Sequence, residues 1–228
     1  MSTPTDRSAA RFFDGFAQTF DSLYDGRRSA LWRWIDRRFR SDMFVRYAWT
    51  FEQLGDLCGK TVLDIGCGSG PYLVEALRRG ARKVTGVDPA PGMLALARER
   101  LRNTDAGERA QLIEGSFPEV GTGQHDFGIV MGVMDYVDRP EEFLAALRPV
   151  IRRSVVLSFP STHWLRTPLR KVRYRMRGCP VYLFDEERIR RLLPAAGFAV
   201  AEVRKIPGAG MDYHVCLSDP TATSPSSR

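Results

Sequence analysis

The sequence predicts an α/β fold built on a parallel sheet that is covered on both faces, and three observations lead to this prediction. The run Thr61–Ile65 is short, apolar and partly β-branched, as expected of a buried strand. A glycine-rich turn and a helical pattern follow it. A second strand pattern, Lys83–Asp88, comes next. Strand, turn, helix and strand in this order form the first half of a mononucleotide-binding unit.

The turn after Ile65 is suited to a close approach between backbone and ligand. It carries three alternating glycines, which have no Cβ and allow a sharp turn: Gly66, Gly68 and Gly70. Residues 71–79 then show apolar side chains at helical spacing and end before Gly80, a natural C-cap. The pattern therefore predicts a ligand loop that leads into a helix.

Two acids frame this turn and indicate the kind of ligand. Asp88 ends the second strand 22 residues after Gly66, where a carboxylate can accept both hydrogen bonds of a ribose diol. Asp64 lies two residues before the turn, where it would repel phosphate and suit a sulfonium or an α-ammonium group. The turn also lacks the G-x-G-x-x-G spacing of dinucleotide sites, and the chain has no phosphate-binding G-x-x-x-x-G-K-[ST] loop. A dinucleotide oxidoreductase is therefore disfavoured.

The segments Asp-Ile-Gly-Cys-Gly-Ser-Gly (64–70), Gly-Val-Asp (86–88) and Met-Leu (93–94) resemble the class I S-adenosylmethionine-dependent methyltransferases. The resemblance covers residues 55–217 and implies a Rossmann-like sheet of seven strands with helices on both faces and an antiparallel edge hairpin. It implies S-adenosylmethionine as the cofactor. The cofactor-binding residues that it implies are Tyr24, Asp64, Gly66, Cys67, Gly68, Asp88, Pro89, Met93, Ser116, Phe117 and Met131.

One of these positions departs from the family pattern. Many relatives carry an acid where this chain has Ser116, and that acid receives the adenine amino group. A serine hydroxyl can still accept a hydrogen bond, so we retain Ser116 as a site residue.

The remaining elements of this domain follow in chain order. We expect helices over residues 91–103, 139–150 and 185–193, the last with Asp185 as its N-cap. We expect strands over residues 110–114, 126–132, 154–159, 198–205 and 211–217.

Residues 1–54 carry aromatic side chains at helical spacing and are expected to form an N-terminal helical lid. The helical patterns cover residues 11–24, 31–39 and 44–51. In the resembled methyltransferases such helices lie across the cofactor site, and residues 20–25, which include Tyr24, look like the closing segment. Two alternatives remain open, a stripe that only packs on the core and a helix that lies on a membrane surface.

Residues 160–184 form a basic, aromatic insertion without a single acid, which we expect to cap the substrate. Its cations are Arg166, Arg170, Lys171, Arg173, Arg175 and Arg177. The short link before the fifth strand and the Ser-Phe-Pro after it are similar to magnesium-protoporphyrin O-methyltransferases and several small-molecule O-methyltransferases. Residues 218–228 are polar, rich in serine, threonine and proline, and expected to be disordered.

The expected chemistry is direct displacement of a sulfonium methyl group by a hydroxyl, carboxylate or amine of a small, anionic or aromatic molecule. Alignment of the reacting atoms supplies most of what this reaction needs. A hydroxyl acceptor also benefits from a general base, and His163, Asp135 and Tyr136 are the candidates near the strand ends.

Composition and charge indicate where the protein is located and which metals and partners to expect. The chain carries a net charge of +7 and lacks both a membrane-length apolar run and a signal peptide, so we expect a cytoplasmic protein. Its four cysteines form no C-x-x-C pair, so no metal site is expected. We expect no DNA partner and do not favour membrane contact. A non-catalytic S-adenosylmethionine-binding scaffold and an RNA methyltransferase remain as alternatives, and the oligomeric state stays open.

Overall fold

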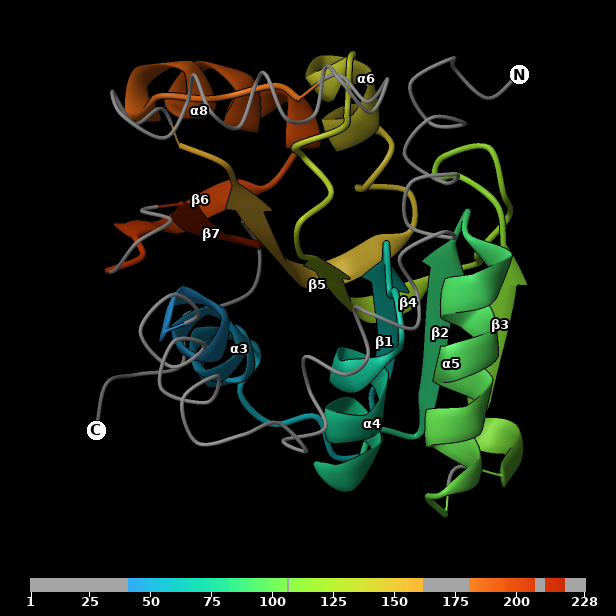
Figure 1. Cartoon of the computed structure of the whole chain (residues 1–228). Helices are drawn as coiled ribbons and strands as arrows, with labels where there is room; N and C mark the ends of the chain where they lie inside the picture. The colour runs from blue at the N-terminus through green and yellow to red at the C-terminus, as the bar shows by residue number, and fades with distance from the viewer. Residues whose placement is uncertain (1–40, 106, 162–180, 208–211, 220–228) are drawn as a thin grey trace, which may run out of the picture.

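The computed structural model describes residues 41–105, 107–161, 181–207 and 212–219 (Figure 1). Tyr24, His163, most of the 160–184 insertion and all but the first two residues of the tail lie outside these ranges. The expectations for them stay predictions.

The core of the molecule is a seven-stranded sheet with the order β3-β2-β1-β4-β5-β7-β6. β1 pairs in parallel with β2 and β4, whereas β7 runs antiparallel to both β5 and β6. The strands are β1 (Thr61–Ile65), β2 (Lys83–Asp88), β3 (Ala110–Glu114), β4 (His125–Val130), β5 (Ile151–Phe159), β6 (Ala199–Lys205) and β7 (Tyr213–Ser218). The predicted sheet with its antiparallel edge pair is confirmed.

Helices cover both faces of this sheet (Figure 1). One face packs against α3 (Ser41–Leu54), α4 (Pro71–Arg78) and α5 (Pro91–Arg102). The other packs against α6 (Pro140–Ala145), α8 (Glu186–Leu192) and the 3-10 turn η2 (Leu193–Ala196). A second 3-10 turn, η1 (Gly107–Arg109), precedes β3.

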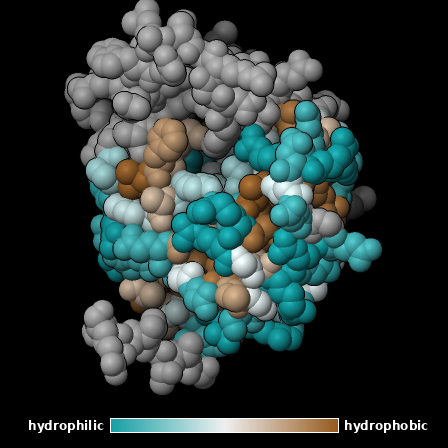
Figure 2. Space-filling view, turned by 90° about the horizontal axis from the view of Figure 1, so that it is seen from below, coloured by the Kyte–Doolittle hydropathy of each residue, from teal (hydrophilic) through white to brown (hydrophobic). Residues whose placement is uncertain are grey.

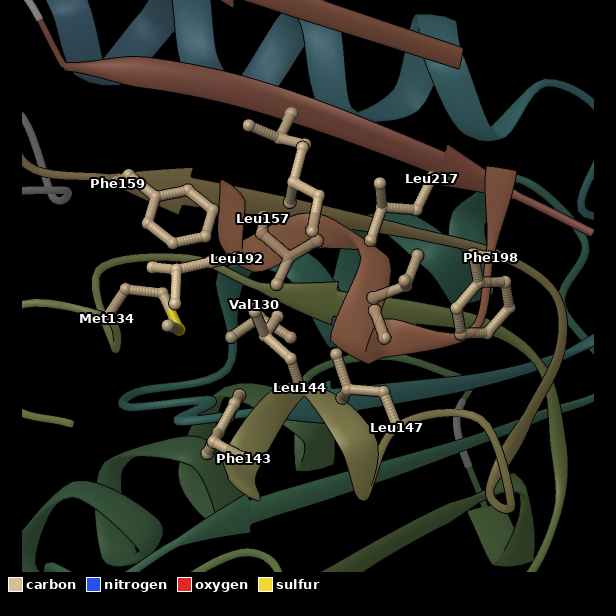
Figure 3. Packing of buried hydrophobic residues seen from close by; sticks show 14 of the residues in the cluster. Val130, Met134, Phe143, Leu144, Leu147, Leu157, Phe159, Leu192, Phe198 and Leu217 are labelled. Atoms are coloured by element: carbon tan, nitrogen blue, oxygen red, sulfur yellow. The ribbon is translucent and has the colours of Figure 1, made fainter. Parts of the chain in front are cut away.

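Side-chain alternation along the strands explains why both faces can be apolar. In β5, Val155 and Leu157 belong to the cluster under α6 and α8, while Val156 belongs to the cluster under α3 to α5. Figure 3 shows the first cluster, in which Leu144 of α6 and Leu192 of α8 approach the strand residues. Each face therefore has its own buried core.

Three boundaries near a proline or a glycine differ from the expectation. The helix expected over residues 139–150 ends at Ala145 and gives way to turns, since Pro149 has no N–H and disfavours helical geometry in the residue before it. β5 consequently begins at Ile151 instead of residue 154. β4 ends at Val130, and Gly132 has a φ of 72° in the loop beyond it.

The outer surface carries both polar and apolar residues. In the view from below, polar residues cover most of the described surface, and the apolar residues form small areas between them (Figure 2). Among the described helices, none has the length and hydropathy needed to cross a bilayer.

Candidate functional site

A cavity of about 640 Å³ lies at the carboxyl ends of β1, β2 and β4, where open parallel sheets bind ligands. Except for Asp64, every described residue expected to bind the cofactor lines it, namely Gly66, Cys67, Gly68, Asp88, Pro89, Met93, Ser116, Phe117 and Met131. Of the general-base candidates, Tyr136 lines the cavity. The structure thus brings the predicted loop, strand ends and helix α5 together around one space.

The glycine loop is held against the end of β2 by its backbone. The N–H groups of Gly66 and Cys67 both donate to the Val87 carbonyl, at 2.7 and 3.1 Å. Gly66 has a φ of 72°, and a Cβ at this position would lie 2.4 Å from Cγ2 of Val133. Glycine is therefore required at residue 66 both by the backbone conformation and by the space around it.

Asp88 positions the loop and also faces the cavity. One carboxylate oxygen accepts a hydrogen bond from the N–H of Gly68 at 2.8 Å, and the other accepts from Ala90 at 2.9 Å. Burial raises the pKa of Asp88, although these two hydrogen bonds oppose the shift. Because each carboxylate oxygen has more than one acceptor site, the group can also accept hydrogen bonds from a diol in the cavity.

Asp64 lies behind the loop rather than in the cavity wall. Its side chain is 1% exposed, and Oδ2 has no hydrogen-bond partner among the described residues. Burial, and secondarily the nearby Asp88, raise its pKa to about 8. A buried carboxyl oxygen without a partner is costly, and a cation or a donor bound nearby would lower that cost.

Two further loop side chains complete this part of the cavity. Ser69 lines it, is 1% exposed, and its hydroxyl has no hydrogen-bond partner among the described residues. The pKa of the Cys67 thiol is raised well above its usual value, first by burial and then by Asp64 and Asp88. Cys67 thus stays a neutral thiol, and it is part of the cavity wall rather than a nucleophile.

An aromatic part of the cavity wall comes from α3 and α4. Tyr47 lies 5.2 Å from Phe51 and 5.1 Å from Tyr72, measured between ring centroids. Burial and the neighbouring Glu75 raise the pKa of Tyr47 to about 12, so its hydroxyl stays protonated at neutral pH. Phe44 also lines the cavity and is 68% exposed.

Sequence reasoning did not single out these α3 and α4 residues as part of the site. The signal that was available is the spacing of aromatic residues at positions 44, 47 and 51, which predicted a helix and a lid but no individual contacts. Arg46, which also lines the cavity, was hidden among the many cations of the N-terminal region.

Asp135 and Tyr136 are placed differently. Asp135 is 7% exposed and is not part of the cavity wall, and its carbonyl accepts a hydrogen bond from the N–H of Tyr182 at 2.8 Å. Tyr136 is half-buried and faces the cavity. The roles of both residues in catalysis stay predictions.

The strand order, the glycine loop and Asp88 at the tip of β2 define the chain as an α/β protein with the Rossmann-like methyltransferase fold. Residues 62–154 match the family described as "Methyltransferase domain".

Relatives and solved structures agree with this assignment. The chain is 31% identical over 110 residues to a ubiquinone biosynthesis O-methyltransferase of Acinetobacter baumannii, covering 47% of this chain and 46% of the relative. It is 35% identical over 123 residues to a tRNA U34 carboxymethyltransferase of Idiomarina loihiensis, covering 52% of this chain and 37% of the relative. The chain thus spans about half the length, or less, of these curated relatives.

Similarity in structure extends over most of the chain. The magnesium protoporphyrin IX methyltransferase of Synechocystis, solved with bound S-adenosylhomocysteine, superposes with a TM-score of 0.72 at 21% identity. The match covers 93% of this chain and 99% of that protein. At this level of identity the likeness establishes a shared fold.

Proposed function

We propose that the chain is an S-adenosylmethionine-dependent methyltransferase that acts on a small, anionic or aromatic molecule. The observation that carries the proposal is the composition of the cavity. Its wall combines the glycine loop and Asp88 with the aromatic side chains Tyr47 and Tyr72. The O-methyltransferase relatives and the fold shared with a tetrapyrrole methyltransferase support a small-molecule acceptor.

The residues around the glycine loop fit the cofactor. Asp88 would hold the ribose, Ser116 and Phe117 would contact the adenine, and the amino-acid portion would lie along the glycine loop near Asp64 and Ser69. The Ser69 hydroxyl lines the cavity and has no hydrogen-bond partner among the described residues, so it is suited to accept a hydrogen bond from an ammonium group. S-adenosylmethionine supplies an electrophilic methyl group on a sulfonium, which a nucleophile can displace directly.

The protein contributes alignment and the exclusion of water. Met131, Val133 and Phe117 are apolar parts of the cavity wall. Holding an acceptor in line with the methyl group in such a space can lower the barrier by several kcal/mol through proximity alone, and by about 7 to 11 kcal/mol where the alignment is best. Tyr136, Asp135 and His163 remain the proposed sources of a general base for a hydroxyl acceptor.

We also infer how the flanking segments contribute. Residues 1–54 would act as a lid, since α3 supplies residues to the aromatic part of the cavity wall. Residues 160–184 would cap the acceptor and residues 55–217 would form the catalytic domain. A cytoplasmic location stays a prediction.

Isothermal calorimetry tests the cofactor assignment directly. S-adenosylmethionine and S-adenosylhomocysteine should bind, and NAD should bind much more weakly, because the loop lacks the G-x-G-x-x-G spacing that holds a pyrophosphate. Gly66→Val is the control, since it places a side chain against Val133 and should abolish binding. Tighter binding of NAD than of S-adenosylhomocysteine would overturn the proposal.

An acceptor screen separates the small-molecule function from its alternatives. Methyl transfer from labelled S-adenosylmethionine should be detected with aromatic acids or phenols and not with bulk tRNA. Transfer to tRNA would favour an RNA methyltransferase instead. The observation that supports this alternative is the 35% identity to a tRNA U34 carboxymethyltransferase. Cofactor binding without transfer to any acceptor would favour the scaffold reading.

A further inference from the structure

We infer that Ser158 is a positioning residue of the site, whose hydroxyl holds the loop after β4 in the place where it can contact the bound cofactor. The inference rests on the proposed methyltransferase function and adds a residue to it. Ser158 is the second-last residue of β5 and is 2% exposed. It is not among the described residues that line the cavity, so it acts on a ligand through the residues that it holds.

The Ser158 hydroxyl lies where the pairing of β4 with β5 stops. The last pair between the two strands is Val130 with Leu157. Gly132, two residues after Val130, has left the extended conformation and has a φ of 72°. Its N–H donates a hydrogen bond to Oγ of Ser158 at 2.9 Å. A side chain thus supplies the acceptor that a backbone carbonyl would supply if the two strands continued to pair.

The same hydroxyl also contacts helix α3. Side chains alternate along β5, so the side chain of Ser158 points to the same face as that of Val156, which is the face that α3 covers. On this face, Nη1 of Arg46 donates to Oγ of Ser158 at 3.4 Å. Ser158 therefore connects the end of β5 both to α3 and to the loop after β4.

The loop that Ser158 holds is part of the cavity wall and packs against the glycine loop. Its residues in the wall are Met131, Gly132, Val133, Tyr136 and Val137. Val133 follows Gly132 directly, and its Cγ2 would lie 2.4 Å from a Cβ added to Gly66. A displacement of Gly132 would therefore change both the cavity wall and the packing against the glycine loop. Cofactor binding thus depends on a hydroxyl that the cofactor does not touch.

Three variants of Ser158 test this dependence by isothermal calorimetry with S-adenosylhomocysteine. Ser158→Ala should bind it about fivefold less tightly than the wild-type protein, because the net loss of one hydrogen bond lowers the fraction of molecules in which the loop is in place. Ser158→Cys keeps a side chain of similar size with a much weaker acceptor, and it should behave like Ser158→Ala. Ser158→Thr keeps the hydroxyl and should recover most of the affinity. A urea titration checks the stability of each variant.

Ser154→Ala is the matched control, because Ser154 lies on the same strand, points to the same face and is also buried. It pairs with Phe127 near the start of β4 and is not among the described wall residues, so its loss should leave the affinity unchanged. Hydrogen exchange followed by mass spectrometry reports on the loop itself. Exchange in residues 131–137 should become faster in Ser158→Ala and stay unchanged in Ser154→Ala.

The failure of this inference is distinguishable from that of the proposed function. Wild-type affinity in Ser158→Ala, an equal loss in Ser154→Ala, unchanged exchange in the loop, or no recovery in Ser158→Thr would each overturn the inference while the wild-type protein still binds the cofactor. A wild-type protein that fails to bind S-adenosylhomocysteine would overturn the proposed function and this inference with it.

Discussion

At the scale of single residues, the burial of Asp64 makes stability depend on pH. Its pKa is raised from 3.8 to about 8, so the folded protein keeps a proton that the unfolded chain releases above about pH 4. The contribution of Asp64 to the free energy of unfolding is therefore fully present below that pH and is lost as pH rises toward 8. The slope can reach about 1.4 kcal/mol per pH unit.

Asp64→Asn reveals this dependence because asparagine has no proton to lose. Denaturant titrations of both proteins should show the wild-type free energy of unfolding falling, relative to that of the variant, between about pH 5 and pH 7.5. Taking the difference cancels the other titrating groups. A difference that stays constant over this range would contradict the elevated pKa.

Asp88 gives a second prediction at the same scale. Asp88→Ala should weaken S-adenosylhomocysteine binding by about 2 to 4 kcal/mol, because it removes the acceptor for the ribose hydroxyls and also frees the N–H groups of Gly68 and Ala90. Calorimetry measures the change, and circular dichroism checks the fold. Asp88→Asn keeps one acceptor oxygen, so its affinity for S-adenosylhomocysteine should fall between those of the wild-type protein and Asp88→Ala. Unchanged affinity in a folded alanine variant would place the ribose elsewhere.

At the scale of elements, Gly86 allows β2 to pack closely against α4 and β3. A Cβ at this position would lie 2.7 Å from Leu73, 2.8 Å from the sulfur of Cys67 and 2.9 Å from Leu112. Gly86→Ala should therefore destabilise the protein by about 1 to 3 kcal/mol, the usual cost of overpacking a core.

Gly121→Ala is the matched control, because no atom lies within 4 Å of its Cβ position. Urea titration should show a lower midpoint for Gly86→Ala and a nearly unchanged one for Gly121→Ala. Since Cys67 belongs to the glycine loop, the first variant should also bind S-adenosylhomocysteine less tightly. Equal midpoints for the two variants would show that the core around Gly86 has room to relax.

The same scale shows what local sequence patterns can predict. β1, β2 and β3 have the predicted bounds, because apolar runs flanked by glycine or polar residues have few other ways to be buried. The helix over 139–150 was predicted too long because its apolar spacing continues through Leu147, while Pro149 ends the helical geometry. Patterns thus locate elements more reliably than they locate their ends.

At the scale of the whole molecule, two parts of the cavity wall differ in how far the sequence predicts them. The part around the glycine loop follows from a compact motif, since residues 64–70 and Asp88 are close in sequence and meet through adjacent strands. The aromatic part depends on the placement of α3 against the far strands. Arg46 and Ser158 are 112 residues apart, and no local pattern predicts that they touch.

The position of β7 has a consequence for the order in which the sheet can be completed. β7 follows β6 in the chain, yet it lies between β5 and β6 and supplies the strand pairing of both. While the protein is being synthesised, β6 leaves the ribosome before the neighbour it requires. Until residues 213–218 emerge, the edge of β5 is open to pairing with another chain.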